Sequence, residues 1–216
     1  MLWPTQDPLN ATDPEKVDSM SDIDRALELA PIEDTSTSIS HPPHLESANK
    51  ARHQQRQQLM AAYHEAGHAV VGITLGRTLD TVTIIPEVVD GELIGGCCRW
   101  EYQPAEETWA DLFLEIAWLK AGYVAQALAC RMTWLDYGAV SDDASAQKIA
   151  DSLHRHLTDD AMRREQVKAT LKRATDLARS IVLSPNGRTA LQALADRLLE
   201  RGTVSGEEGT LLVWFS

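Results

Sequence analysis

The stretch Tyr63-His64-Glu65-Ala66-Gly67-His68-Ala69-Val70-Val71 determines how the rest of the chain is interpreted. Its two histidines are four residues apart, so on a helix they lie about 40° apart around the axis, one turn from each other. Two imidazole nitrogens at that spacing can reach one metal ion. Glu65 is turned by about 100° from His64, which places its carboxylate beside the ion as a general base. The pattern therefore predicts a helical metal site with His64 and His68 as ligands.

Apolar residues with helical spacing surround this stretch. Met60, Val71 and Leu75 fall on the same helical stripe as the two histidines, so we expect the imidazoles to face the core. Buried imidazoles need partners for their nitrogens, which favours a ligand role. Gly67 is a poor helix former, and its place between the histidines predicts that another segment packs closely there.

A third protein ligand is expected, because a catalytic zinc site takes three and leaves one position for water. One known pattern places Gly and His three and six residues after the second histidine, but Val71 and Thr74 occupy those positions here. Glu115, on a following helix, is one candidate, and Asp142 and Asp143, at the start of a later helix, are others. Negative charge in a first helical turn also explains the two aspartates, so the residue chemistry leaves the choice open.

The charge of the chain is acidic and uneven. The 216 residues carry a net charge of −12, and 44% of them are apolar. Residues 1–48 contain ten acidic and two basic residues, a net charge of −8, which leaves −4 for residues 49–216. We expect residues 1–48 to be a partly disordered acidic tail or linker and residues 49–216 to be one domain. An acidic chain gains nothing from counterion release at phosphates, which argues against nucleic acid as a partner.

Cysteine usage and hydropathy predict a reducing compartment. Cys97, Cys98 and Cys130 are odd in number and match neither a disulfide framework nor a zinc knuckle, so we expect reduced, mostly buried thiols. The N-terminus lacks the basic start and apolar core of a signal peptide. Uninterrupted apolar runs such as residues 69–73 fall far short of the ~20 residues that cross a bilayer. We therefore expect a cytoplasmic protein that makes no contact with a membrane.

The periodicity predicts a mainly helical domain with one small β-sheet, which is an α+β fold. The expected helices cover residues 47–75, 108–130, 142–156, 159–183 and 191–200. The expected strands cover residues 80–86 and 92–100. Gly95 and Gly96 lie inside the second strand, where they indicate either a bulge or the close approach of another backbone.

Four segments resemble the peptidase domain of the FtsH-type, ATP-dependent zinc proteases. Residues 62–70 resemble the metal-binding helix of that family, including the Ala-Gly pair between the histidines, and residues 82–86 resemble its following strand. Residues 121–126 resemble an Ala-Gly-x-x-Ala-Glu helix with Gln126 in place of Glu. Residues 138–142 resemble a Gly-Ala-x-Asn-Asp segment with Ser in place of Asn. The resemblance extends unevenly over about residues 60–212.

The resemblance implies that Asp142 is the third zinc ligand. In that family, alanines follow the liganding aspartate by four and by eight residues. Counting from Asp142 reaches Ala146 and Ala150, whereas counting from Asp143 reaches no alanine.

The resemblance also implies an activity, which is zinc-dependent cleavage of peptide bonds in unfolded or flexible proteins, with Glu65 as the catalytic base. Gly95 and Gly96 are expected to contact a substrate that adds as a strand. Family members carry a membrane anchor and an AAA ATPase module, but this sequence has no G-x-x-x-x-G-K-[ST] phosphate loop. We therefore expect a stand-alone peptidase that is ATP-independent by itself or works with a separate AAA ATPase. The sixfold rings of the family imply a homo-oligomer.

Two alternatives stay open. The chain is either an enzyme, or a non-catalytic, zinc-stabilised module that assembles with and modulates a full-length FtsH-type protease. Glu65 argues against the second, because a structural site does not need it. A zinc hydrolase acting on a non-peptide substrate is the other alternative, since a fold does not determine a function.

Overall fold

The computed structural model describes residues 43–216, except 90–91, 102–107, 131–136 and 216. The predicted acidic tail thus lies almost entirely outside the described residues, although its last residues, from Pro43 on, belong to the first helix. The helices are α1 (Pro43–Thr74), α2 (Trp109–Cys130), α3 (Tyr137–Leu153), α4 (Asp160–Leu183), α5 (Pro185–Arg201) and α6 (Gly206–Trp214). The strands are β1 (Leu79–Thr83), β2 (Glu87–Val89), β3 (Glu92–Ile94), β4 (Cys97–Trp100) and β5 (Thr203–Ser205).

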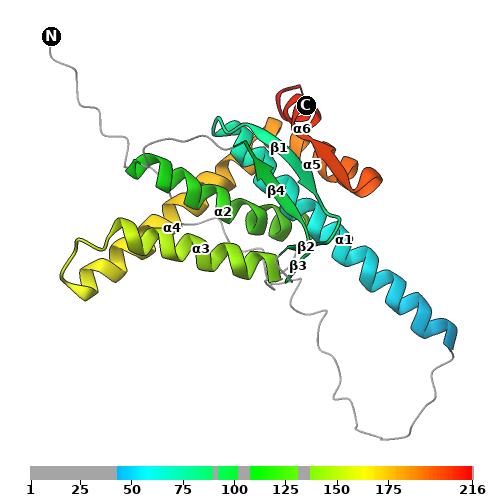
Figure 1. Ribbon diagram of the computed structural model, residues 1–216, viewed down its shortest axis with the longest axis horizontal. Coiled ribbons are helices and arrows are strands. Elements are labelled where there is room, and N and C mark those ends of the chain that lie inside the picture. The colour runs from blue at the N-terminus through cyan, green and yellow to red at the C-terminus, as the bar shows by residue number, and fades with distance from the viewer. Residues whose placement is uncertain (1–42, 90–91, 102–107, 131–136, 216) are drawn as a thin grey trace, which may run out of the picture. The chain divides into compact units, whose positions relative to one another are not determined.

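The mainly helical fold with a small sheet is confirmed (Figure 1). Three antiparallel strands are ordered β4-β1-β5, with Val82 of β1 opposite Cys98 on one side and Val204 on the other. Strands β2 and β3 form a separate antiparallel pair. In the described part of the chain, β4 pairs with β1 alone, so β4 is an edge strand of its sheet.

The prediction of one strand over residues 92–100 was wrong. Gly95 and Gly96 separate β3 from β4, and the two strands pair in different sheets. Glycine loses the most backbone entropy on ordering and has no side chain to pack in a strand, so a pair of glycines ends the pairing. The preceding strand is also shorter than predicted, because it ends at Thr83.

The prediction that α3 begins at Asp142, with Ser141 as its cap, was also wrong. The helix starts at Tyr137, so Asp142 and Asp143 lie in its second turn and not in its first. Serine is a frequent N-cap residue but also occurs inside helices, and the residues before it continue the helix toward the N-terminus.

Capping residues mark the other helix boundaries. Asp159 caps α4 by accepting hydrogen bonds from two main-chain N–H groups of its first turn. Ser184 ends α4 and caps α5, and Pro185 occupies the first position of α5, six residues before the predicted start at Leu191. Helix α6 and strand β5 were not predicted. Ser205 accepts a hydrogen bond from the Glu208 N–H, and this Ser-x-x-Glu pattern is the signal that marks α6.

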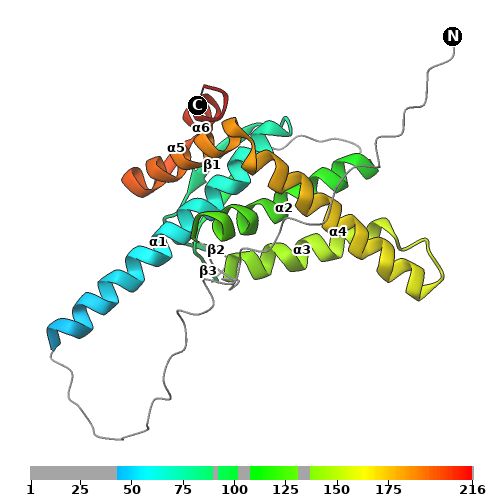
Figure 2. The same ribbon diagram turned by 180° about the vertical axis from the view of Figure 1, so that it is seen from behind.

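Close packing of α1 on α2 forms the centre of the domain. A Cβ atom at Gly67 would lie 2.5 Å from Ala125 Cβ and 2.7 Å from the Ala121 carbonyl oxygen. The close packing predicted at Gly67 is therefore confirmed, because only glycine lets the two helices approach this far. The first part of α1 is different: residues 49–59 are all exposed, and this part of the helix extends away from the other elements (Figures 1 and 2).

Helix α2 meets the length and composition of a membrane-crossing segment over Trp109–Ala129, contrary to the sequence-based expectation. That expectation considered uninterrupted apolar runs, and Glu115 and Lys120 interrupt this one. In the structure, 44% of the apolar window is buried inside the protein, and the core helices of soluble proteins meet the same criteria. The match is therefore weak evidence for a membrane segment.

We expect Gly67→Ala to destabilise the domain. Alanine is favoured over glycine inside a helix by about 1 kcal/mol. Forcing a methyl group into a filled contact costs about 1–3 kcal/mol, so the clash with α2 outweighs the gain. The free energy of unfolding should fall by up to about 2 kcal/mol in urea titrations of the metal-free protein. Gly95→Ala is the matched control, because its added methyl group meets nothing within 4 Å. A Gly67→Ala variant more stable than the parent would contradict the packing described here.

Candidate metal centre

Two histidines and one aspartate from different helices meet in the interior. His64 and His68 lie one turn apart on α1, and their side chains are 6% and 5% exposed. Their Nε2 atoms are 3.1 Å apart. Asp142, on α3, places its Oδ2 atom 3.1 Å from His64 Nε2 and 3.0 Å from His68 Nε2. Three ligand-type atoms therefore converge on one point.

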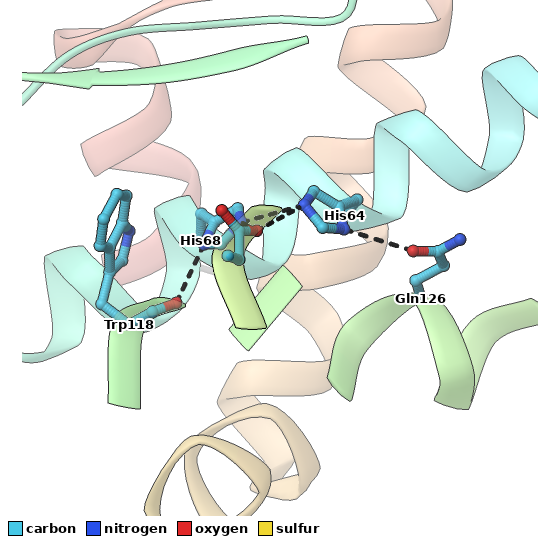
Figure 3. A network of polar contacts seen from close by, with 5 residues as sticks. His64, His68, Trp118 and Gln126 are labelled. Atoms are coloured by element: carbon cyan, nitrogen blue, oxygen red, sulfur yellow. Dashed lines mark hydrogen bonds and ion pairs between the residues drawn. The ribbon is translucent and has the colours of Figure 1, made fainter. Parts of the chain in front are cut away.

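Helix α2 determines which ring nitrogens carry protons. His68 Nδ1 lies 2.9 Å from the Trp118 carbonyl oxygen, and His64 Nδ1 lies 3.3 Å from Gln126 Oε1 (Figure 3). A carbonyl oxygen only accepts hydrogen bonds, so each Nδ1 carries the hydrogen and donates it. In a neutral imidazole the other nitrogen is then unprotonated. Both Nε2 lone pairs consequently point at the Asp142 carboxylate oxygen.

This arrangement suits a metal ion. Three acceptor atoms packed 3.0–3.1 Å apart repel one another unless a cation lies among them. Ligand atoms in tetrahedral zinc sites are about 3.4 Å apart, as follows from bonds of about 2.0–2.1 Å, so the observed spacing is close to that of a ligand set. Burial raises the pKa of the Asp142 carboxyl, whereas hydrogen bonds that His64 and His68 donate when their Nε2 atoms are protonated lower it well below its usual range, and a bound cation would take the place of those protons. The carboxylate is thus ionised, as a ligand must be.

A glycine on α2 lets both imidazoles lie against that helix. A Cβ atom at Gly122 would lie 2.5 Å from His68 Nε2 and 2.7 Å from His64 Nε2. Gly122 is four residues after Trp118 and four before Gln126, so the three residues share the stripe of α2 that faces the metal helix. One stripe therefore supplies both hydrogen-bond acceptors and the room that the two imidazoles need between them.

Glu65, the residue after His64, lies next to Gly96, which directly precedes strand β4. Its side chain is buried, with 8% of the residue exposed, and a Cβ atom at Gly96 would lie 2.7 Å from Glu65 Oε1. Gly96 thus leaves room beside this carboxylate, directly before the edge strand β4. Gly95 is exposed, and an added methyl group there would meet nothing within 4 Å.

The neighbouring thiols of Cys97 and Cys98 do not belong to the group of converging ligand atoms that His64, His68 and Asp142 form. Cys97 and Cys98 are free, and burial, followed by smaller effects that include the negative charge of Glu65, raises the pKa of both. A thiol with a raised pKa stays protonated at neutral pH, which makes it a poor nucleophile. The side chain of Cys130 lies outside the described part of the structure.

The remaining candidates for a third ligand are engaged elsewhere. Glu115 accepts a hydrogen bond of 2.7 Å from Arg77, and Asp143 forms an ion pair with Lys120. In the part of the chain that the structure describes, His64, His68 and Asp142 form the only group of three or more His, Cys, Asp or Glu side chains whose ligand atoms lie within 4.8 Å of one another.

Sequence reasoning did not identify the contributions of Trp118 and Gly122. Trp118 acts through its main-chain carbonyl, which every residue type has, so no sequence signal marks it. Gly122 has a signal, because a glycine inside a helix and four residues from a polar side chain indicates a close approach.

We expect Gly122→Ala to abolish tight binding of divalent metal without removing a ligand. The added methyl group would occupy the space next to both Nε2 atoms, which should weaken zinc binding by at least about tenfold, the lower end of the loss on mutating residues that support metal ligands. Competition with a chromogenic chelator measures the affinity, and Gly95→Ala serves as the matched control. Unchanged zinc affinity in a folded Gly122→Ala protein would show that the ion lies elsewhere.

Known proteins provide an independent comparison. No family model matches the chain. The chain is 35% identical over 106 residues to the ATP-dependent zinc metalloprotease FtsH of Mycoplasmopsis synoviae, a match that covers 48% of this chain and 16% of the relative. It is 34% identical over 96 residues to FtsH of Mesomycoplasma conjunctivae, covering 44% and 12%, and 30% identical over 151 residues to FtsH of Acholeplasma laidlawii, covering 67% and 20%. The chain thus matches no more than a fifth of the length of these relatives. It is related in sequence to the FtsH family of ATP-dependent zinc metalloproteases.

Proposed function

We propose that this protein is a zinc-dependent endopeptidase that cuts unfolded or flexible protein segments. His64, His68 and Asp142 would hold the zinc ion, and Glu65 would act as the general base. One observation carries the proposal: the Nε2 atoms of two imidazoles, whose Nδ1 atoms face carbonyl oxygens, lie 3.0–3.1 Å from each other and from a carboxylate oxygen, beside a buried glutamate. The sequence relationship to zinc metalloproteases supports the choice of metal and reaction.

When bound, zinc supplies Lewis acidity, which polarises the scissile carbonyl and acidifies water. The residues of the chain do the rest. Glu65 takes a proton from the attacking water, holds it on its carboxylate and returns it to the leaving amine nitrogen as the carbon–nitrogen bond breaks. Trp118 and Gln126 keep the two imidazoles in the required tautomer and orientation through their Nδ1 hydrogens. The neutral Gln126 amide orients His64 without adding a second negative charge.

The edge strand β4 is suited to bind a substrate in extended form. Its unpaired edge can accept another strand through main-chain hydrogen bonds, which read little of the substrate sequence. Residues 97–100 follow Gly96 directly, and Gly96 lies against Glu65. A chain added along β4 would therefore run past the base. In this proposal Gly95 and Gly96 contact the substrate, and unfolded segments of varied sequence are the substrates.

The proposal extends to partner proteins. The relatives are named as ATP-dependent enzymes. We propose that this chain hydrolyses flexible segments without ATP, and that a separate AAA ATPase or assembly into a homo-oligomer extends its range. A non-catalytic module that modulates an FtsH-type protease is less well supported, because a purely structural zinc site does not need a glutamate next to its first histidine ligand.

We expect Glu65→Gln to bind zinc but to lose proteolysis. The amide has nearly the same shape as the carboxylate but cannot take up a proton, so cleavage of unfolded casein should fall by about 10²–10⁴-fold, the usual contribution of a general base. Zinc content, measured by atomic emission, should stay at one ion per chain. Glu165→Gln, on the exposed surface of α4, is the matched control.

Three outcomes would change this assignment. Full casein cleavage by the zinc-bound Glu65→Gln protein would remove Glu65 from the mechanism. A wild-type protein that binds zinc and joins an FtsH-type protease without turnover would favour the non-catalytic module. Turnover of small esters or amides, with no cleavage of unfolded protein, would indicate a different zinc hydrolase.

A further inference from the structure

We propose that Lys120 is a positioning residue: its ion pair with Asp143 fixes helix α3 so that Asp142 reaches His64 and His68. The inference rests on the proposed function only in requiring that these three side chains hold a metal ion. It concerns two residues that the site geometry described above leaves without a role.

The two side chains of this ion pair differ in how far they are exposed to solvent. The Lys120 side chain is 12% exposed, whereas that of Asp143 is 57% exposed. A lysine removed from water needs its charge paired, while an exposed aspartate is solvated in either case. Lys120 therefore gains more free energy from the ion pair than Asp143 does. Burial of the Lys120 ammonium group thus favours the position of α3 at which Asp143 reaches it.

The ion pair lies on the interface between α2 and α3. On α3, Asp143, Ala146 and Ala150 are spaced by three and four residues, so they share one stripe. On α2, Lys120 follows Ile116 by four residues. Ile116, Ala146 and Ala150 are fully buried in one apolar cluster. The Lys120–Asp143 contact is thus the charged end of an otherwise apolar interface, at the end nearer the metal site.

Apolar packing alone does not set the register of α3. Hydrophobic contact is non-directional, and two buried alanines present small, similar surfaces to α2. An ion pair between one ammonium group and one carboxylate has a defined partner, so it selects one rotation and one height of α3. Asp142 is the neighbour of Asp143 and lies about 100° away around the helix axis. Any shift of α3 that moves one of these aspartates also moves the other.

The site tolerates little movement of Asp142. Its Oδ2 atom lies 3.0–3.1 Å from both imidazole nitrogens, and metal–ligand bonds vary by only about 0.2 Å. Loss of the ion pair should therefore weaken zinc binding, even though neither Lys120 nor Asp143 touches the ion. Residues that orient metal ligands typically change metal affinity by about 10–100-fold when they are replaced.

The test measures zinc affinity in folded variants by chelator competition, with circular dichroism to verify folding. Lys120→Met keeps the length of the side chain and removes its charge, and Asp143→Asn neutralises the exposed partner. Each should bind zinc about 10–100-fold more weakly than the parent, and Lys120→Arg should retain most of the affinity. If Lys120→Met does not fold, Asp143→Asn decides the question. Lys172→Met is the matched control, because it breaks an exposed lysine–aspartate pair on α4.

A purely structural role is separated by repeating the measurement without the third ligand. In an Asp142→Ala background, Lys120→Met should cause no further loss of zinc affinity, because its effect acts through Asp142. Parent-like affinity of folded Lys120→Met, or an equal loss in both backgrounds, would overturn the inference. A parent that binds zinc but does not cleave casein would refute the proposed peptidase alone, and a parent that binds no zinc would overturn both.

Discussion

The structure depends on one contact, in which the Asp142 carboxylate meets the Nε2 atoms of His64 and His68. It joins α1 to α3, two helices whose meeting residues are more than seventy positions apart in sequence. The same contact is unfavourable without a cation, since both ring nitrogens carry lone pairs and the carboxylate is charged. A group of side chains that repel one another without an ion and are stabilised when an ion binds is typical of a metal-binding site.

Helix α2 packs against α1 and supplies the groups that orient the two histidines. Trp118 and Gln126 accept the two Nδ1 hydrogens, and Gly122, four residues from each on the same stripe, lets both imidazoles lie against α2. Gly67 lets α1 approach α2 closely enough for these contacts to form. Gln126 gives the site a neutral partner where related sequences are expected to have a carboxylate, so His64 is oriented with less electron donation from its partner.

The sequence was sufficient to predict what depends on local spacing. The His64–His68 pair, the helix that carries it and the close packing at Gly67 all follow from positions within a few turns. Asp142 was one of three candidates on chemistry alone, and only a family resemblance selected it, because tertiary packing brings it to the histidines. The start of α3 and the strand over residues 92–100 were predicted wrongly, since Ser141 and the glycine pair each have more than one structural use. The Trp118 carbonyl has no sequence signature at all.

Crystals of the zinc-loaded protein, measured at wavelengths on both sides of the zinc absorption edge, would show whether these three side chains hold the ion. We expect one anomalous peak per chain, within about 2.0–2.2 Å of His64 Nε2, His68 Nε2 and a carboxylate oxygen of Asp142. An anomalous peak elsewhere, or an ion on the two histidines with the Asp142 carboxylate turned away and another side chain in its place, would contradict this expectation.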